Sequence, residues 1–170
     1  VLFRSDQSGR LELAALKTAH HTCLKNNEII IAVVANAGCT PTGSIDPLQA
    51  IGDYCQSHDL WFHVDGAYGL AGILSHYTRP LFKGLELADS FIVDPHKWLF
   101  APFDACALVY RDPEIGRLAH TQHGEYLDIL TETGDWNPSD YAYNLTRRPR
   151  GLPLWFSLAT HGVSAYRDAI

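Results

Sequence analysis

The chain has 170 residues, of which 46% are hydrophobic and 19% charged, so it can bury a substantial core and is neither disordered nor collagen-like. Its formal net charge of −6 argues against a nucleic-acid partner. No stretch is long and apolar enough to span a membrane, and the amino end has no signal-peptide pattern. We therefore expect a cytoplasmic protein.

The residue types that bind metals lie far apart in the sequence. The cysteines form no C-x-x-C pair, so we predict reduced thiols in or near the core rather than a zinc site or disulfides. His120 and His123 could share a helix face, but no third ligand accompanies them, and we predict no metal site. The chain contains no methionine, and we expect it to be a fragment of a longer protein. The cysteines are Cys23, Cys39, Cys55 and Cys106.

The first part of the chain reads as a helix, a strand and a second helix. Apolar residues recur at helical spacing over 11–26, which predicts a helix that packs one face on a sheet. The continuous apolar run over 29–36 predicts a parallel strand buried on both faces. After a loop rich in glycine and threonine, Asp46 is the predicted N-cap of a helix that runs to about residue 58, with Pro47 in its first turn.

Strands and helical segments continue to alternate. Residues 60–65 form the next predicted strand, whose period of two places His63 and Asp65 on one face. A short strand over 91–93 and another over 105–111 are joined by too little chain for a helical crossover, so the last strand should run antiparallel. The pattern predicts an α/β fold with a mostly parallel sheet and one antiparallel strand. Further helical segments are expected over 69–75, 79–87, 113–122 and 150–170.

Lys97 follows directly after the strand over 91–93, between His96 and Trp98. In α/β proteins the carboxyl ends of strands are where ligands bind. We expect a lysine held there to be partly buried, and burial lowers the pKa of an amine so that it can act as a nucleophile. The alternative is that Lys97 extends past Trp98 to water.

Two segments carry a resemblance to a known family. The sequence HVDGAY over 63–68 and the sequence SFIVDPHKWL over 90–99 resemble the group II pyridoxal-phosphate-dependent decarboxylases, the family of aromatic amino acid and glutamate decarboxylases. The resemblance implies the large domain of a fold type I, aspartate aminotransferase-like enzyme. Residues 1–130 would belong to this domain, and residues 131–170 would be a loop and a linker helix toward a smaller domain.

The resemblance also implies a cofactor, pyridoxal 5′-phosphate (PLP), and roles for individual residues. Lys97 would form the internal aldimine, and Asp65 would be buried and ionised and would keep the pyridine nitrogen protonated. Ala67 would lie against one face of the ring, His96 next to the cofactor and Thr40 near the ring. We expect Asp65 and Lys97 on one side of the sheet, separated by a gap that fits a pyridine ring.

Each assignment has a plainer alternative. Asp65 could cap a helix, and His96 could be a hydrogen-bonded packing residue. Thr42 is a rival for the role of Thr40, and either could merely close a turn. Asp94 stands where several relatives carry asparagine near the cofactor phosphate. A carboxylate there would repel the phosphate, so we do not transfer that contact.

The reaction implied is the decarboxylation of an L-amino acid by a full-length homodimer. The proton-donating tyrosine would be Tyr141, with Tyr143 and Tyr126 as alternatives, although each could be an aromatic anchor. Other possibilities are a different lyase of the same fold, aldehyde lyase or desulfurase-like, and a catalytically silent fragment. The residues that bind the phosphate and stack on the ring would lie outside this chain. The fragment alone is therefore expected to be inactive, and its sequence does not identify the substrate amino acid.

Overall fold

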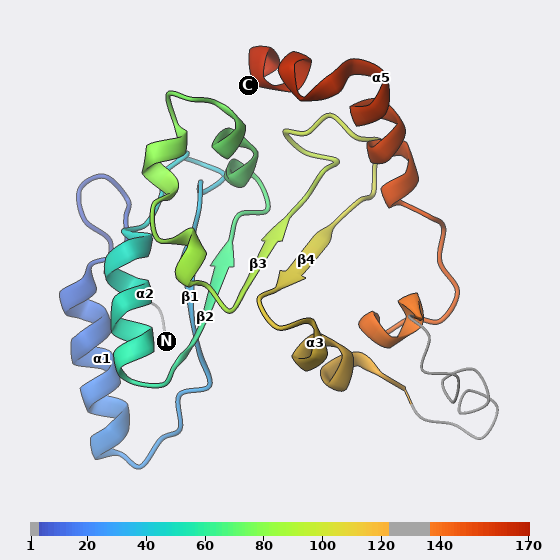
Figure 1. Cartoon of the computed structure of the whole chain (residues 1–170). Helices are drawn as coiled ribbons and strands as arrows, with labels where there is room; N and C mark the ends of the chain where they lie inside the picture. The colour runs from blue at the N-terminus through green and yellow to red at the C-terminus, as the bar shows by residue number, and fades with distance from the viewer. Residues whose placement is uncertain (1–3, 123–136) are drawn as a thin grey trace.

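The computed structural model describes residues 4–122 and 137–170. Figure 1 shows a sheet with helices packed on one side and a long helix along one edge. The elements in chain order are α1 (Leu13–Lys25), β1 (Ala32–Asn36), α2 (Leu48–Ser57), β2 (Trp61–Asp65), η1 (Gly69–Leu74), η2 (Arg79–Phe82), η3 (Leu85–Leu87), β3 (Ser90–Val93), β4 (Ala107–Tyr110), α3 (Pro113–His120), η4 (Pro138–Tyr141) and α5 (Gly151–Ala169).

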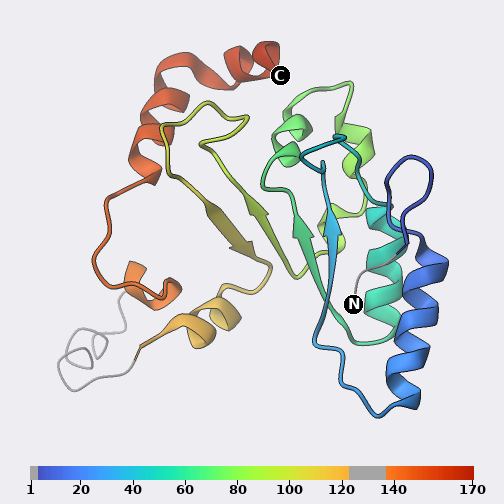
Figure 2. The same ribbon diagram turned by 180° about the vertical axis from the view of Figure 1, so that it is seen from behind.

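The four strands form one sheet in the order β1-β2-β3-β4. Strands β1, β2 and β3 are parallel, and β4 runs antiparallel to β3 with Phe91 opposite Val109. In Figures 1 and 2 the arrowheads of β1, β2 and β3 point to one edge of the sheet. The predicted α/β fold with a mostly parallel sheet is confirmed, and so is the antiparallel direction of the last strand.

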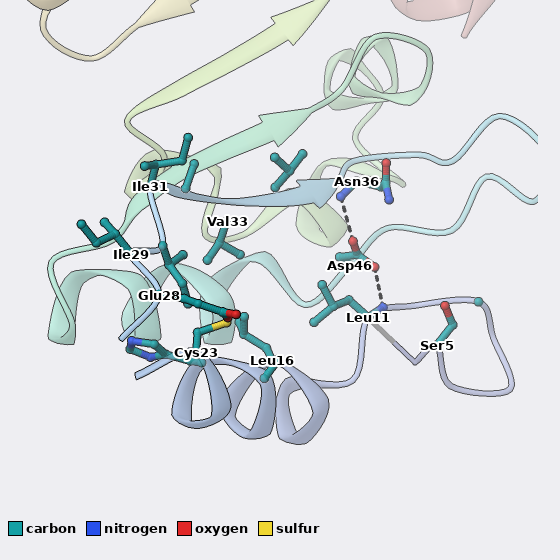
Figure 3. A pocket seen from close by; sticks show the side chains of 16 residues that line it. Ser5, Leu11, Leu16, Cys23, Glu28, Ile29, Ile31, Val33, Asn36 and Asp46 are labelled. Atoms are coloured by element: carbon teal, nitrogen blue, oxygen red, sulfur yellow. Dashed lines mark hydrogen bonds between the residues drawn. The ribbon is translucent and has the colours of Figure 1, made fainter. Parts of the chain in front are cut away.

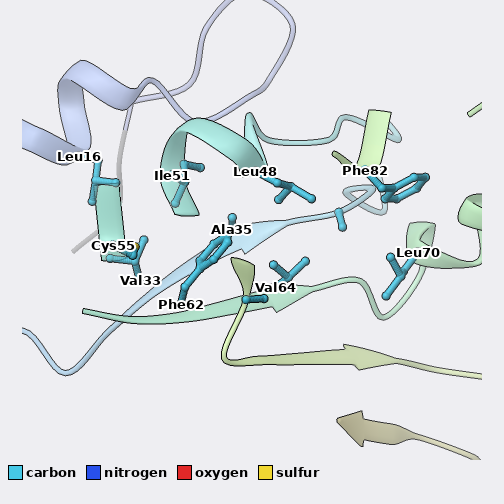
Figure 4. Packing of buried hydrophobic residues seen from close by; sticks show 12 residues of the cluster. Leu16, Val33, Ala35, Leu48, Ile51, Cys55, Phe62, Val64, Leu70 and Phe82 are labelled. Carbon is cyan, nitrogen blue, oxygen red and sulfur yellow. The ribbon is translucent and has the colours of Figure 1, made fainter. Parts of the chain in front are cut away.

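The core lies between the two helices α1 and α2 and one face of β1 and β2 (Figure 4). Leu16 comes from α1 and Ile51 from α2, while Phe62 and Val64 come from β2, and all four are almost fully buried. Burial of each such side chain contributes about 1.5–3 kcal/mol. Because side chains alternate along a strand, His63 and the other odd-numbered residues of β2 occupy the opposite face, as predicted.

Strand β1 is shorter and more exposed than the sequence predicts. It begins at Ala32, and Ile29 and Ile31 before it are 89% and 84% exposed. Val33 is buried in the core, but Val34 on the other face is 51% exposed. The prediction of a strand buried on both faces is wrong, because the core cluster covers only one face of β1 among the described residues.

Asp46 links two segments instead of capping α2, so the predicted N-cap is wrong. Pro47 occupies the N-cap position of α2, which has no side-chain cap bond. The buried carboxylate of Asp46 accepts the N–H of Leu11 at 2.6 Å and the N–H of Asn36 at 2.7 Å (Figure 3). It therefore satisfies backbone donors at the end of β1 and just before α1.

Helix α5 is present as predicted but is interrupted at Gly162. This residue has φ +73° and ψ 164°, a conformation that is open to glycine and strained for other residues. The helix changes direction there and lies along the edge to which β2 and β3 point (Figures 1 and 2). Arg167 of α5 donates from Nε to the carbonyl oxygen of Leu74 at 3.2 Å.

The four cysteines all have free thiols. Cys23 and Cys55 are buried and Cys39 is half-buried, in keeping with the predicted core or near-core positions. Cys106 is exposed, so the prediction is wrong for this residue. Its place in the loop before β4 keeps it outside the core cluster. No helix within residues 4–122 and 137–170 is both long and apolar enough to cross a membrane.

Candidate active site

The loops that follow β2 and β3 are joined at the shared edge of the sheet. The backbone N–H of Asp94 donates to the carbonyl oxygen of Ala67 at 3.0 Å. The ring of Trp98 stacks on the ring of Tyr68, with 5.5 Å between centroids and 14° between planes. These two contacts place the turn that carries Lys97 beside the loop that follows Asp65.

Lys97 lies in a turn in which its N–H donates to the carbonyl oxygen of Asp94 at 2.9 Å. Its Nζ forms an ion pair with Oδ2 of Asp94 at 2.7 Å, and the two side chains are 38% and 13% exposed, respectively. Lys97 is thus less buried than we expected.

Asp65 ends β2 and is exposed. Its Oδ1 accepts the N–H of Ala67 at 3.1 Å. The expectation that it is buried is wrong for this chain, because the face of β2 that it shares with His63 lies away from the core. The capping alternative has no support either, because η1 begins at Gly69 with Tyr68 as its N-cap and has no side-chain cap bond.

The parallel register relates the two predicted catalytic residues. Asp65 lies opposite Ile92 in β3, and Lys97 lies in the turn that follows the same strand. Both residues therefore stand at the same edge of the sheet. That their side chains leave a gap for a pyridine ring stays a prediction.

His63 belongs to a small polar network that sequence reasoning missed. Its Nδ1 lies 2.7 Å from Oγ of Ser90, and the same Oγ accepts the indole N–H of Trp61 at 3.0 Å. Which of the two groups donates between His63 and Ser90 depends on the tautomer of the ring. Burial lowers the pKa of His63, and the charge of Asp65 opposes this shift. The only signal in the sequence was the position of His63 on the same strand face as Asp65.

His96 packs against Phe103 and Ala105, near the end of the loop that joins β3 to β4. Its Nδ1 lies 2.5 Å from the carbonyl oxygen of Ala105 and 3.2 Å from the nitrogen of that residue, and which contact is made depends on the tautomer. The ring meets Phe103 edge to face at 5.0 Å. His96 therefore is a hydrogen-bonded packing residue, and its role beside a cofactor stays a prediction.

The loop after β1 carries both candidate threonines. Oγ1 of Thr42 lies 2.9 Å from Oγ of Ser44, a contact that closes the turn, whereas Thr40 is exposed. Gly38 in this loop has φ +100°, and a Cβ at Gly38 would lie only 2.4 Å from Cα of Gly69. The absence of side chains at both glycines therefore lets the loop after β1 touch the loop after β2. Sequence reasoning missed this contact.

The first candidate tyrosine, Tyr141, does not lie at this edge. Tyr141 ends η4, which packs against α3, and α3 follows the far end of β4 at the opposite edge of the sheet (Figure 1). Tyr143 is exposed, and its ring contacts the guanidinium of Arg147 at 5.4 Å. Tyr126 and His123 lie outside the described residues, and His120 contacts the hydroxyl of Tyr110 at 3.0 Å.

A cavity of about 650 Å³ lies elsewhere, between α1 and β1 (Figure 3). Apolar side chains such as Leu16, Ile31 and Val33 line it together with the buried carboxylate of Asp46. The predicted site residues are not among its lining, so this cavity is separate from the candidate site.

Comparison with known proteins identifies the family. The family model for the pyridoxal-dependent decarboxylase conserved domain matches residues 2–170. Aromatic-L-amino-acid decarboxylase of Bacillus atrophaeus is 35% identical over 168 residues, which are 98% of this chain and 35% of that protein. 3,4-Dihydroxyphenylacetaldehyde synthase of Aedes aegypti is 35% identical over 172 residues, 99% of this chain and 33% of that protein. The crystal structure of Oryza sativa TDC with PLP and tryptamine matches with a TM-score of 0.88 and 29% identity, over 95% of this chain and 33% of that chain.

The chain belongs to the pyridoxal-dependent decarboxylase family, and the predicted family, fold and PLP cofactor are confirmed. It spans about a third of the length of these relatives.

Proposed function

We propose that the protein containing this chain is a PLP-dependent L-amino-acid decarboxylase, with Lys97 and Asp65 in its active site. The observation that carries the proposal is the hydrogen bond from the N–H of Asp94 to the carbonyl oxygen of Ala67. It joins the two loops at the carboxyl ends of neighbouring parallel strands, where α/β folds bind ligands. A nucleophilic amine and a carboxylate thus share one edge of the sheet.

The residues at this edge fit the chemistry of PLP. The amine of Lys97 can bind the aldehyde covalently, and the carboxylate of Asp65 can pair with a protonated pyridine nitrogen. Ala67 has a small side chain that leaves room for one face of a ring. When bound, PLP serves as the electron sink that lets the α-carboxylate of an amino acid leave.

The residues at this edge would have distinct roles. Lys97 would hold the cofactor through its amine. Asp65 would pair with the ring nitrogen, and His63 lies behind it on the same strand face, in contact with Oγ of Ser90. The Nζ of Lys97 is paired with the carboxylate of Asp94.

The remaining assignments belong to the same proposal. His96 lies next to the cofactor, Thr40 lies near the ring, and Tyr141 or one of its alternatives donates a proton. The full-length protein is a cytoplasmic homodimer that acts on a small amino acid substrate. Residues 1–130 form part of the PLP-binding domain, and residues 131–170 lead toward a smaller domain. Family resemblance alone supports these assignments.

Aldehyde formation is the second candidate activity. The aldehyde synthase of Aedes aegypti is as similar to this chain as the decarboxylase of Bacillus atrophaeus, at 35% identity for both. Both candidates release carbon dioxide, so product analysis is needed to separate them.

The test is to incubate the full-length protein with PLP and a panel of L-amino acids: tyrosine, tryptophan, 3,4-dihydroxyphenylalanine, glutamate and cysteine sulfinate. Carbon dioxide together with the matching amine supports decarboxylation, and carbon dioxide with an aldehyde supports the second candidate. A protein that binds PLP but releases no carbon dioxide from any of these substrates would contradict both.

A further inference from the structure

We infer that Asp104 is a positioning residue for the lysine loop, defined as residues 94–106 between β3 and β4. Two arginines that lead into α5 clamp its carboxylate, and this clamp sets how firmly Lys97 can hold the cofactor. The inference rests on the proposed function, because it concerns the binding of PLP to Lys97.

The clamp joins one carboxylate to two guanidinium groups. Oδ1 of Asp104 accepts from Nη2 of Arg148 at 2.8 Å and from Nε of Arg150 at 2.8 Å, and Oδ2 lies 3.4 Å from Nη2 of Arg150. The hydrogen bond from Arg150 is the main reason that the pKa of Asp104 is lowered to about 2. Asp104 is therefore ionised at neutral pH.

The clamp acts on a loop that has no helix or strand of its own. Asp104 precedes Ala105, whose backbone contacts Nδ1 of His96. His96 in turn precedes Lys97. A short path of bonded groups therefore leads from the clamp across the loop to the lysine.

The other side of the clamp is anchored to α5. Arg150 immediately precedes this helix, and the ring of Tyr166 near its far end lies 6.4 Å from the ring of Phe100 in the lysine loop. The helix thus contacts the loop at two separate points. Arg148 and Arg150 lie 44 and 46 positions after Asp104 in the sequence. Their contact with Asp104 therefore fixes the start of α5 relative to the lysine loop.

The clamp should affect the position of the lysine loop more than the free energy of unfolding of the protein. Exposed ion pairs add little to the free energy of unfolding because water screens them. Arginine and carboxylate groups bonded through parallel N–H donors do, however, fix geometry closely. Loss of the clamp should therefore loosen the lysine loop without unfolding the protein.

The experiment measures the rate of PLP dissociation from the full-length protein, followed by the absorbance of bound cofactor after dilution. Asp104→Asn should raise this rate about tenfold, the effect of one lost hydrogen bond to a charged group. Asp104→Glu keeps the negative charge, and its dissociation rate should lie between those of Asp104→Asn and wild type. Glu114→Gln is the matched control, because it removes a similar Arg117–Glu114 pair in α3, bonded at 2.8 Å and 2.5 Å. It should leave the rate unchanged, and both variants should have nearly the same melting temperature.

The outcomes separate this inference from the proposed function. If wild type binds no PLP, the proposed function fails and the inference fails with it. If wild type binds PLP and Asp104→Asn releases it at the wild-type rate, only the inference is overturned. A fall in melting temperature far beyond that of Glu114→Gln would show a merely structural role. Should Asp104→Asn not fold, Arg150→Gln takes its place, with the same expected rate increase.

Discussion

The N–H of Asp94 donates to the carbonyl oxygen of Ala67 at 3.0 Å, so the chain that enters the lysine turn is joined to the chain that leaves β2. Both partners are backbone atoms, and the parallel register that places Asp65 opposite Ile92 brings them together. The frame that holds Lys97 and Asp65 at one edge therefore does not depend on either side chain. Substitutions at these two positions can test the chemistry while the fold is kept.

Asp65→Asn should slow the reaction of the bound cofactor without preventing cofactor binding. The amide is nearly isosteric with the carboxylate but cannot pair as an anion with a protonated ring nitrogen. PLP should still bind to Lys97, while decarboxylation should slow by about 10²–10³-fold, the usual effect of removing one electrostatic contact to the reacting group. The measurements are bound-cofactor absorbance and carbon dioxide release. A variant that binds PLP and retains a rate within about threefold of wild type would assign Asp65 to a structural role.

His63 should make stability depend on pH. Burial lowers its pKa in the folded protein, so the unfolded chain takes up a proton first as the pH falls through the usual histidine range. The stabilisation is complete above about pH 6.5 and decreases as the pH drops toward the folded pKa.

Melting temperatures measured between pH 8 and pH 5 test this expectation. Wild type should lose stability on the acid side more steeply than His63→Gln does, and the His63 ring should titrate below about 6.5 by NMR. Parallel pH profiles for the two proteins, or a titration above that value, would refute the assignment.

Gly38→Ala should disturb the contact between the loops after β1 and β2. The new Cβ would lie 2.4 Å from Cα of Gly69, and φ at Gly38 is +100°. Gly43→Ala is the control, because Gly43 also has a positive φ, of +68°, but nothing lies within 4 Å of a Cβ there. The control should cost only the backbone term, about 1–2 kcal/mol, and Gly38→Ala clearly more. Equal losses in the free energy of unfolding would show that the loops can separate without cost.

Local patterns predicted much of the fold correctly. The period of two in β2, the helical spacing in α1 and the short connection before β4 depend on neighbouring residues alone. The position of Lys97 after β3 followed from the same patterns. The failures concern burial, because the exposure of Val34 and Asp65 depends on what covers the second face of the sheet.

Non-local contacts could not be predicted either. Asp46 looked like a helix cap because it directly precedes Pro47, and its true partners lie 10 and 35 residues away. The clamp on Asp104 likewise joins residues more than 40 positions apart. The spacing of residues in one sequence does not indicate which distant residues form such pairs.

The most direct test of the central claim is to map the covalent site of PLP. The full-length protein is loaded with PLP, reduced with borohydride and digested, and the modified peptide is identified by mass spectrometry. The label should lie on Lys97, and Lys97→Ala should abolish both label and activity while the protein stays folded. The other lysines of the chain, Lys17, Lys25 and Lys83, are exposed and serve as internal controls. A label on any of these, or one that persists in Lys97→Ala, would contradict the proposal.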